Sequence, residues 1–196
     1  MNNKGKLMKT FAYLLVLIAI FQIITGCALL PFGGEESPQE QVAVVKTVKG
    51  TFVVEFYPES APKTVENFIK LIDLKFYDGL IFHRILKTPG LSVVQGGCPN
   101  GDGYGGPGWT IVDEYTNPNQ RKHLRGTIAM ARPDRPNSAG SQFYICLKPQ
   151  PHLDGGYTTF GSVIQGMEVV DNLVMGDVIT KIRLEAKSKY VKSSES

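Results

Sequence analysis

The stretch GLIFHRILKTPGLSVVQGG, residues 79–97, consists of two apolar runs with a Pro-Gly pair between them. β-Branched and aromatic residues around such a pair are typical of two strands joined by a turn. Arg84 stands in the first run, where an arginine is unusual unless a partner or a ligand takes its charge. Two interpretations remain open: a buried ion pair with Asp113 or Glu114, or a guanidinium that projects over an apolar binding groove.

The segments on either side predict more short strands and two helices. An opening hairpin, Val42–Val48 and Thr51–Tyr57, has only Lys49-Gly50 between its arms. One helix is expected to start at Pro62, since the first turn does not need an amide donor there. With a second helix at Met167–Val174, the other predicted strands are Leu80–Leu86, Val93–Gln95, Thr127–Ala131, Gln142–Leu147, Thr159–Ile164 and Ile179–Leu184. Many short strands and few helices predict a mainly β fold, closed or nearly closed into a barrel.

The N-terminus has the features of a secretory signal. Three lysines precede an apolar run, Phe11–Ile24, that is short for a membrane span. The run leads to Cys27 through small residues, as in a bacterial lipobox, where the cysteine is lipidated; the alternative is an uncleaved membrane anchor with an incidental cysteine. We expect a lipid-anchored protein on the extracytoplasmic face of the cell membrane. The expected boundaries are a signal peptide over residues 1–26, the lipidated cysteine and a flexible tether over 27–41, a folded domain over 42–186 and a polar tail over 187–196.

Charge and cysteine content argue against several classes of function. Without the first 26 residues, the number of Lys and Arg falls from 21 to 18 and equals the 18 Asp and Glu. A near-neutral chain has no electrostatic reason to bind nucleic acid. Cys98 falls in a Gly/Pro-rich segment and Cys146 in an apolar strand, so two free thiols are expected rather than a disulfide. The histidines are far apart in no metal-binding motif, so we expect no metal site.

Two further segments lack the setting that their chemistry requires. The glycine-rich residues 101–108, GDGYGGPG, are followed by an extended segment rather than a helix, and Pro107 removes a donor. This segment is therefore expected to be a flexible surface loop and not a phosphate-binding site. Ser141 lacks the G-x-S-x-G setting of a nucleophile, which leaves hydrolysis poorly supported.

Several motifs occur in a fixed order along the folded domain: FHRI at 82–85, VQGG at 94–97, GTIAMA at 126–131, NSAGSQFYI at 137–145, LDGGYTTFG at 153–161 and GMEVVD at 166–171. With these motifs the chain resembles the cyclophilins, which are peptidyl-prolyl cis-trans isomerases, from about Val42 to Leu184. The resemblance implies a closed, eight-stranded antiparallel β-barrel capped by two α-helices. It also implies an enzyme without a cofactor, active as a monomer on proline-containing polypeptides.

The resemblance further implies roles for individual residues. Arg84 matches the catalytic arginine and Gln95 the glutamine that binds the substrate backbone, while Ala131 and Arg132 match a strand edge that pairs with the peptide. The substrate-binding residues implied in this way are Leu91, Val93, Ala131, Arg132, Gln142, Tyr144, His152, Leu153 and Tyr157.

Some of these positions depart from the family pattern. One residue is inserted after Pro89-Gly90, and the usual pocket phenylalanine is replaced by Leu91 or Ser92. His152 stands where cyclosporin-sensitive members have tryptophan, and Tyr144 stands where the family has its second phenylalanine. An isomerase that assists the folding of extracytoplasmic proteins is the leading hypothesis. The rivals are a prolyl-peptide binding module or chaperone with weak turnover, and a solute-binding lipoprotein.

Overall fold

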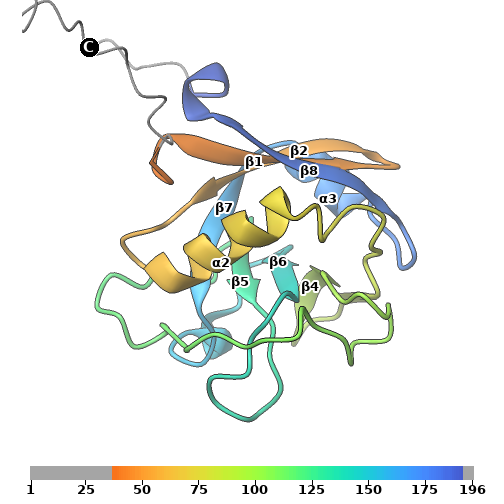
Figure 1. The fold of residues 1–196 in the computed structure, drawn as a ribbon. Helices are drawn as coiled ribbons and strands as arrows, with labels where there is room; N and C mark the ends of the chain where they lie inside the picture. The colour runs from red at the N-terminus through yellow and green to blue at the C-terminus, as the bar shows by residue number, and fades with distance from the viewer. Residues whose placement is uncertain (1–36, 192–196) are drawn as a thin grey trace, which may run out of the picture. The chain divides into compact units, whose positions relative to one another are not determined.

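The computed structural model describes residues 37–191, which form an eight-stranded antiparallel sheet with two α-helices (Figure 1). The hydrogen-bonded strand order is β3-β4-β6-β5-β7-β2-β1-β8. The strands are β1 Gln41–Thr47, β2 Gly50–Phe56, β3 Arg84–Lys87, β4 Ser92–Gly96, β5 Thr127–Met130, β6 Phe143–Cys146, β7 Thr159–Gln165 and β8 Ile179–Ala186. The helices are α2 Pro62–Asp73 and α3 Met167–Asp171, with short 3₁₀ turns η1 Pro151–Leu153 and η2 Lys187–Lys189.

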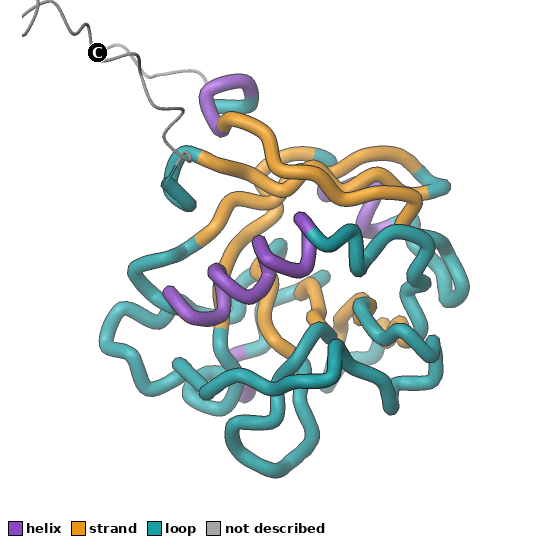
Figure 2. The backbone as a smooth tube through the Cα atoms, viewed as in Figure 1, coloured by secondary structure: helices purple, strands orange, loops and turns teal. Residues whose placement is uncertain are grey.

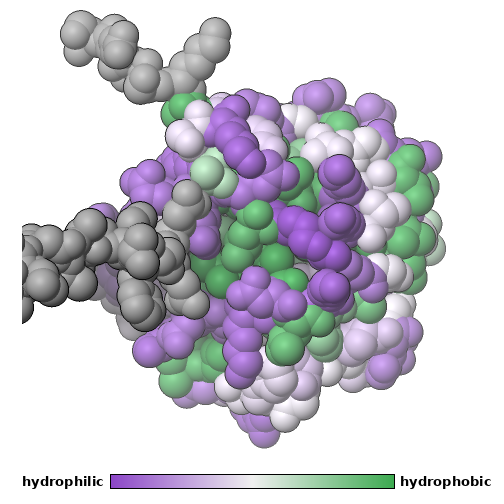
Figure 3. Space-filling view, turned by 45° about the horizontal axis from the view of Figure 1, so that its top comes forward, coloured by the Kyte–Doolittle hydropathy of each residue, from purple (hydrophilic) through white to green (hydrophobic). Residues whose placement is uncertain are grey.

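The sheet curls around a core that α2 covers (Figure 1). Phe68, on the apolar stripe of α2, lies at the centre of this core. Its ring centroid is 4.9 Å from that of Tyr77, 5.0 Å from Phe160 and 5.6 Å from Phe143. Because side chains alternate along a strand, the hairpin β1–β2 also has an outer face, where Val42, Val44 and Val53 form a separate apolar cluster. Figure 3 shows apolar side chains gathered in the middle of the face it displays, with polar ones around them.

Glu114 and Asp113 are both engaged by partners other than Arg84. Pro62 occupies the first turn of α2 as predicted, but the N-cap residue Ala61 has no side-chain acceptor. The Glu114 carboxylate takes that place: it accepts from the amides of Lys63 and Thr64 at 3.0 and 2.8 Å and from the Thr64 hydroxyl at 2.7 Å. Asp113 in turn lies 3.4 Å from the Nε atom of Arg132. Of the two interpretations left open for Arg84, the ion pair with either acid is therefore wrong.

A closed barrel was expected, but the sheet is a curled half-barrel: β3 and β8 are its two edge strands and do not pair with each other as strands. Backbone hydrogen bonds of 2.8 Å do join the residues before β3 to the start of β8: the Gly79 amide donates to the Ile179 carbonyl and the Ile179 amide to the Leu80 carbonyl. These bonds use up the residues expected to begin the strand Leu80–Leu86, so that β3 starts only at Arg84. As a result Phe82 is buried in the core whereas Arg84 is exposed.

The end of the second helix and the start of the tail also differ from expectation. The second helix ends at Asp171 rather than Val174, because the Val174 amide donates to the Asp177 carboxylate at 2.9 Å in a turn. The predicted tail begins with η2, and the Lys187 side chain pairs with Glu55 at 2.9 Å. No helix within residues 37–191 has the length and hydropathy to cross a membrane. The predicted signal peptide, Cys27 and most of the tether lie outside the described residues.

Long connections make up most of the lower half of the molecule in Figure 2. Between β4 and β5 the chain runs from residue 97 to 126 with a single isolated bridge, Ile111 to Ala139. Loops of this length in a compact domain are usually functional. Side chains tie this one to the domain: the Trp109 indole donates to Asn67 of α2 at 2.8 Å, and the Gln120 amide donates to the Ser60 carbonyl at 2.8 Å.

Candidate active site

One cross-strand row brings the two predicted catalytic residues together. The row crosses β3, β4, β6 and β5 and contains, in that order, Arg84, Gln95, Tyr144 and Ala129. Since side chains alternate between the two faces of a sheet, these four share one face. The adjacent row, on the opposite face, packs into the core with Ile85, Val94, Ile145 and Ile128. The register of four short strands therefore sets the spacing of the site.

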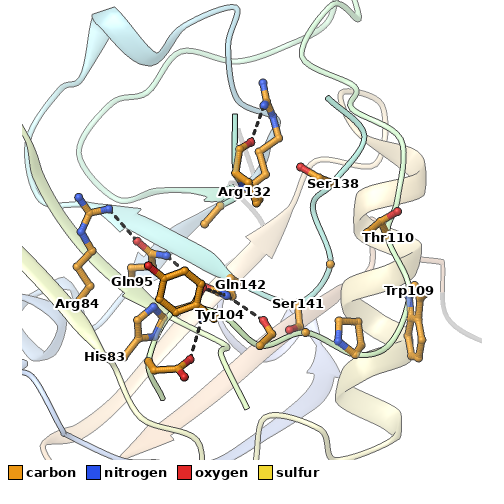
Figure 4. Close-up of a pocket in the computed structure, with 18 residues that line it drawn as sticks. His83, Arg84, Gln95, Tyr104, Trp109, Thr110, Arg132, Ser138, Ser141 and Gln142 are labelled. Carbon is orange, nitrogen blue, oxygen red and sulfur yellow. Dashed lines mark hydrogen bonds between the residues drawn. The ribbon is translucent and has the colours of Figure 1, made fainter. Parts of the chain in front are cut away.

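The polar side chains of this face form a continuous hydrogen-bonded series (Figure 4). The Arg84 Nη1 atom donates to Gln95 Oε1 at 3.3 Å, and Gln95 Nε2 donates to Gln142 Oε1 at 3.1 Å. Gln142 Nε2 then donates to the carbonyls of Gly103 and Gly105, at 2.8 and 2.9 Å. The amide of Gln142 thus connects the strands to the glycine-rich loop and fixes the orientation of both glutamines.

Arg84 itself is exposed, and its guanidinium makes no ion pair with a carboxylate within residues 37–191. Its hydrogen bond to Gln95 engages one of several donors that a guanidinium carries. Arg84 lines both pockets described below, so its remaining donors are available to a ligand. Of the two interpretations of this arginine, the groove contact is the one that agrees with the geometry.

A small apolar pocket opens beside Arg84. Its volume is about 120 Å³. All of its lining residues are among the predicted site residues: Arg84, Leu91, Val93, Gln95, Ala131, Arg132, Tyr144, Leu153 and Tyr157. Most of the lining is aliphatic or aromatic, which suits a small apolar ring rather than a charged group.

The register of β4 decides which residue replaces the missing phenylalanine. Ser92 pairs with Lys87 and is buried, whereas Leu91 lines the apolar pocket. The Thr88 hydroxyl closes the turn: it donates to the Leu91 carbonyl at 2.9 Å and accepts from the Leu91 amide at 3.1 Å. Leu91 gives the pocket a smaller wall than the phenylalanine that the resemblance to cyclophilins implies at this place.

A wider pocket of about 630 Å³ adjoins the apolar one (Figure 4). The two pockets form one groove, because they share the lining residues Arg84, Gln95, Ala131 and Arg132. The glycine-rich loop, expected to be only a surface loop, forms a wall of the wider pocket. Tyr104 of this loop is 92% exposed. The sequence alone did not indicate a role for it.

Arg132 contributes to the groove through its backbone, while its side chain supports the loops. The guanidinium donates to the Gly156 carbonyl at 2.9 Å and lies between the rings of Tyr115 and Tyr157. β5 lies between β6 and β7 and is not an edge strand, and the Ala131 amide already donates to the Gln142 carbonyl at 2.9 Å. The Arg132 amide and carbonyl make no backbone hydrogen bond within residues 37–191, so they remain available to a peptide.

The structure adds His123 and Asp154 to the site, which sequence reasoning did not include. The imidazole of His123 is buried, with Nδ1 2.8 Å from Asp154 Oδ1 and Nε2 2.9 Å from the Tyr144 hydroxyl. Burial lowers the pKa of His123, although the Asp154 carboxylate opposes the shift, and burial raises the pKa of Tyr144. His152, by contrast, is exposed on η1 and lines neither pocket.

Neither cysteine forms a disulfide, and the metal-binding residue types do not cluster in residues 37–191. Cys98 and Cys146 are both buried and free, as predicted. Within the described part of the chain, no cluster of three His, Cys, Asp or Glu side chains could hold a metal ion. The absence of a cofactor stays a prediction.

Comparisons with known proteins agree with this geometry. The family model for cyclophilin type peptidyl-prolyl cis-trans isomerase/CLD matches residues 42–192. The chain is 48% identical over 144 residues to a peptidyl-prolyl cis-trans isomerase of Synechococcus elongatus, covering 72% of this chain and 94% of the relative. It is 50% identical over 131 residues to peptidyl-prolyl cis-trans isomerase B of Bacillus subtilis, covering 67% and 88%.

Solved structures give the same assignment. A crystal structure of a Cryptosporidium parvum cyclophilin type peptidyl-prolyl cis-trans isomerase, in the presence of the dipeptide Ala-Pro, matches with a TM-score of 0.66 at 31% identity, covering 74% of this chain and 99% of that one. Since the family model matches most of the chain, and relatives at about half identity are named for the same activity, this chain belongs to the cyclophilin-type peptidyl-prolyl cis-trans isomerases.

Proposed function

We propose that this isomerase acts on X-Pro bonds of extracytoplasmic proteins and assists their folding, with Arg84 as its catalytic residue. The observation that carries the proposal is the placement of a guanidinium, unpaired with any carboxylate of residues 37–191, at the rim of an apolar pocket. Rotation about an X-Pro bond crosses a barrier of about 18–20 kcal/mol, because it disrupts amide resonance. Uncatalysed exchange takes tens to hundreds of seconds, slow enough to limit folding.

Catalysis of this rotation requires only that the twisted amide be bound better than either planar form. In the twisted state the proline nitrogen regains a localised lone pair and can accept a hydrogen bond. The Arg84 guanidinium can donate to that nitrogen, and in the planar states this acceptor does not exist. Stabilisation is therefore confined to the transition state. No bond is made or broken, so the reaction needs neither a nucleophile nor a cofactor.

The groove supplies the fixed points around which the bond turns. In this proposal the proline ring occupies the apolar pocket against Leu91, Val93 and Tyr144. Gln95 and the free backbone groups of Arg132 hold the flanking peptide in an extended form. The Ala-Pro dipeptide present with the Cryptosporidium parvum relative supports a proline-containing ligand for this groove.

The test measures exchange and binding on the same sample. A peptide with a cis-X-Pro population is mixed with the full-length chain, and cis-trans exchange is followed by NMR magnetisation transfer at substoichiometric protein. Exchange faster than in free peptide supports the isomerase. Binding of the peptide without faster exchange contradicts it and favours the second candidate, a prolyl-peptide binding module, which the loss of the pocket phenylalanine to Leu91 makes worth testing.

The location is proposed from the N-terminal sequence alone. We infer that the protein is a monomeric lipoprotein, held at the extracytoplasmic face by a lipid on Cys27. Replacing Cys27 with alanine is expected to abolish incorporation of labelled fatty acid and to shift the protein toward the soluble fraction. Replacing Cys98 with alanine is the matched control, since this cysteine is buried in the domain. Equal labelling of the Cys27 variant and the unaltered protein would contradict lipidation.

A further inference from the structure

A buried series of hydrogen bonds runs from the apolar pocket to the surface behind it. The Tyr144 ring lines the pocket, and its hydroxyl lies 2.9 Å from His123 Nε2. On the other side of the imidazole, Nδ1 lies 2.8 Å from the carboxylate of Asp154. The side chain of His123 is only 1% exposed and that of Asp154 is 20% exposed. The series therefore connects a pocket wall with a carboxylate that reaches solvent.

The donors and acceptors of this series permit one arrangement at neutral pH. The Asp154 carboxylate can only accept, so His123 Nδ1 carries the proton and donates to it. His123 Nε2 is then an acceptor, and the Tyr144 hydroxyl donates to it. The His123 amide also donates to Asp154 Oδ1 at 2.9 Å, which fixes the carboxylate relative to the histidine backbone. Each member of the series is oriented by the next.

The position of the Tyr144 ring matters for the pocket because of its neighbours. Tyr144 pairs with Gln95 across β4 and β6, and its ring packs edge-on against Tyr157 at a centroid distance of 6.0 Å. A tilt of this ring would change both the apolar wall and the space beside Gln95. A phenylalanine could be held only by packing, whereas the tyrosine is also held at its far end by a hydrogen bond.

We propose that His123 is a positioning residue for peptide binding: through the Tyr144 hydroxyl it fixes the ring that forms the wall of the apolar pocket, while Asp154 holds the histidine in the accepting form. The inference rests on the proposed function, because it takes this pocket to be the site of the proline ring. It assigns to His123 no contact with the peptide. Its expected effect is therefore on affinity, and the rotation step in the bound peptide is left largely unchanged.

Acidification gives the series a characteristic response. A protonated imidazole cannot accept from the Tyr144 hydroxyl, so protonation of His123 reverses the bond: Nε2–H now donates to the hydroxyl oxygen and the hydroxyl hydrogen loses its acceptor, which disturbs the hold on the ring. Because burial lowers the pKa of His123, this happens below the ordinary histidine value of about 6.5. Other titratable or charged groups face this region and must be separated from the effect: Lys122, Cys146, His152, Tyr157, Arg132 and, in the wider pocket, His83.

The test compares KM and kcat for an X-Pro peptide between pH 7.5 and 5.0, using the full-length chain and its variants. Tyr144→Phe and His123→Leu are each expected to raise KM about three- to ten-fold at pH 7.5, the effect of losing one buried hydrogen bond, with kcat changed less than two-fold. Because both changes remove the same bond, the double variant should show no larger rise than the stronger single one. The KM of the unaltered enzyme should rise on acidification, and that rise should be absent in His123→Leu.

Tyr190→Phe is the matched control. It removes a tyrosine hydroxyl that donates to Glu185 at 3.0 Å, away from the groove, and should leave KM and its pH profile unchanged. If Tyr144→Phe and His123→Leu lower the melting temperature but keep the KM and acid response of the unaltered enzyme, the positioning role is wrong. An acid-induced rise of KM that persists in His123→Leu would assign it to another group, such as His83, and would also contradict the inference.

Failure of this inference can be told apart from failure of the proposed function. Arg84→Ala is assayed in parallel under the same conditions. Full kcat in Arg84→Ala overturns the catalytic assignment. It then also removes the proposed function on which the role of His123 depends. A loss of kcat in Arg84→Ala combined with an unaltered KM in the His123 and Tyr144 variants overturns only the positioning role.

Discussion

Replacing Arg84 with alanine is expected to lower kcat/KM for X-Pro isomerisation by about ten- to a thousand-fold. The size follows from the loss of one donor that acts only in the transition state. Stability should change little, because the side chain is exposed and its contact with Gln95 is long, at 3.3 Å. Steady-state isomerisation of an X-Pro peptide gives the kinetic effect, and a thermal melt of the same preparation establishes that the fold persists.

Two further variants make this result specific. Lys87→Ala removes another exposed cation of β3, whose Nζ atom donates to the Asp171 carbonyl outside the groove, and should keep kcat/KM within about two-fold. Arg84→Lys keeps the charge but loses the planar fork of donors, and an intermediate activity is expected. Turnover by Arg84→Ala that equals the unaltered enzyme would show that another group assists the rotation.

Replacing Phe68 with alanine is expected to give the largest loss of stability, about 3–5 kcal/mol of the free energy of unfolding. The ring is 1% exposed and lies at the centre of an aromatic cluster contributed by α2, β6 and β7. Its removal leaves a cavity that surrounding aromatic rings cannot fill without leaving their rotamers. The free energy of unfolding from a urea titration measures the effect directly.

Phe76→Ala is the control for this prediction. Phe76 is only partly buried and meets the core at its edge, against the ring of Tyr77 at a centroid distance of 5.7 Å. Its loss should cost clearly less than that of Phe68. A loss below about 1 kcal/mol in Phe68→Ala, or an equal loss in both variants, would mean that α2 does not fix the core as described.

The sequence predicted correctly those helices and strands that are determined by neighbouring residues in the chain. The hairpin agrees with the structure to within one residue at each end, since β-branched runs around a short turn leave few alternatives. The start of α2 at Pro62 is confirmed, because a proline suited to the first helical turn is itself a local signal. The set of groove residues came from the resemblance to cyclophilins, and the structure places nine of them around one pocket.

What the sequence did not predict depends on contacts between distant segments. Glu114 takes the place of a helix cap 50 residues earlier, so its separation from Arg84 could not be foreseen from their spacing. The choice between Leu91 and Ser92 required the register of β3 against β4. His123 appeared as one of several isolated histidines, and only the fold brings it between Tyr144 and Asp154. The available signal was a tyrosine in place of phenylalanine, which implies a partner for its hydroxyl.

The central claim is that the Arg84 guanidinium acts on the twisted bond and not on the bound planar peptide. The most direct measurement is NMR line-shape analysis of an X-Pro peptide titrated with the enzyme and with Arg84→Ala, which separates the Kd from the exchange rate in the bound state. We predict a Kd within about three-fold and a bound-state exchange rate about ten- to a thousand-fold lower in the variant. An unchanged bound-state rate, with the loss confined to Kd, would make Arg84 a ligand contact and contradict the account.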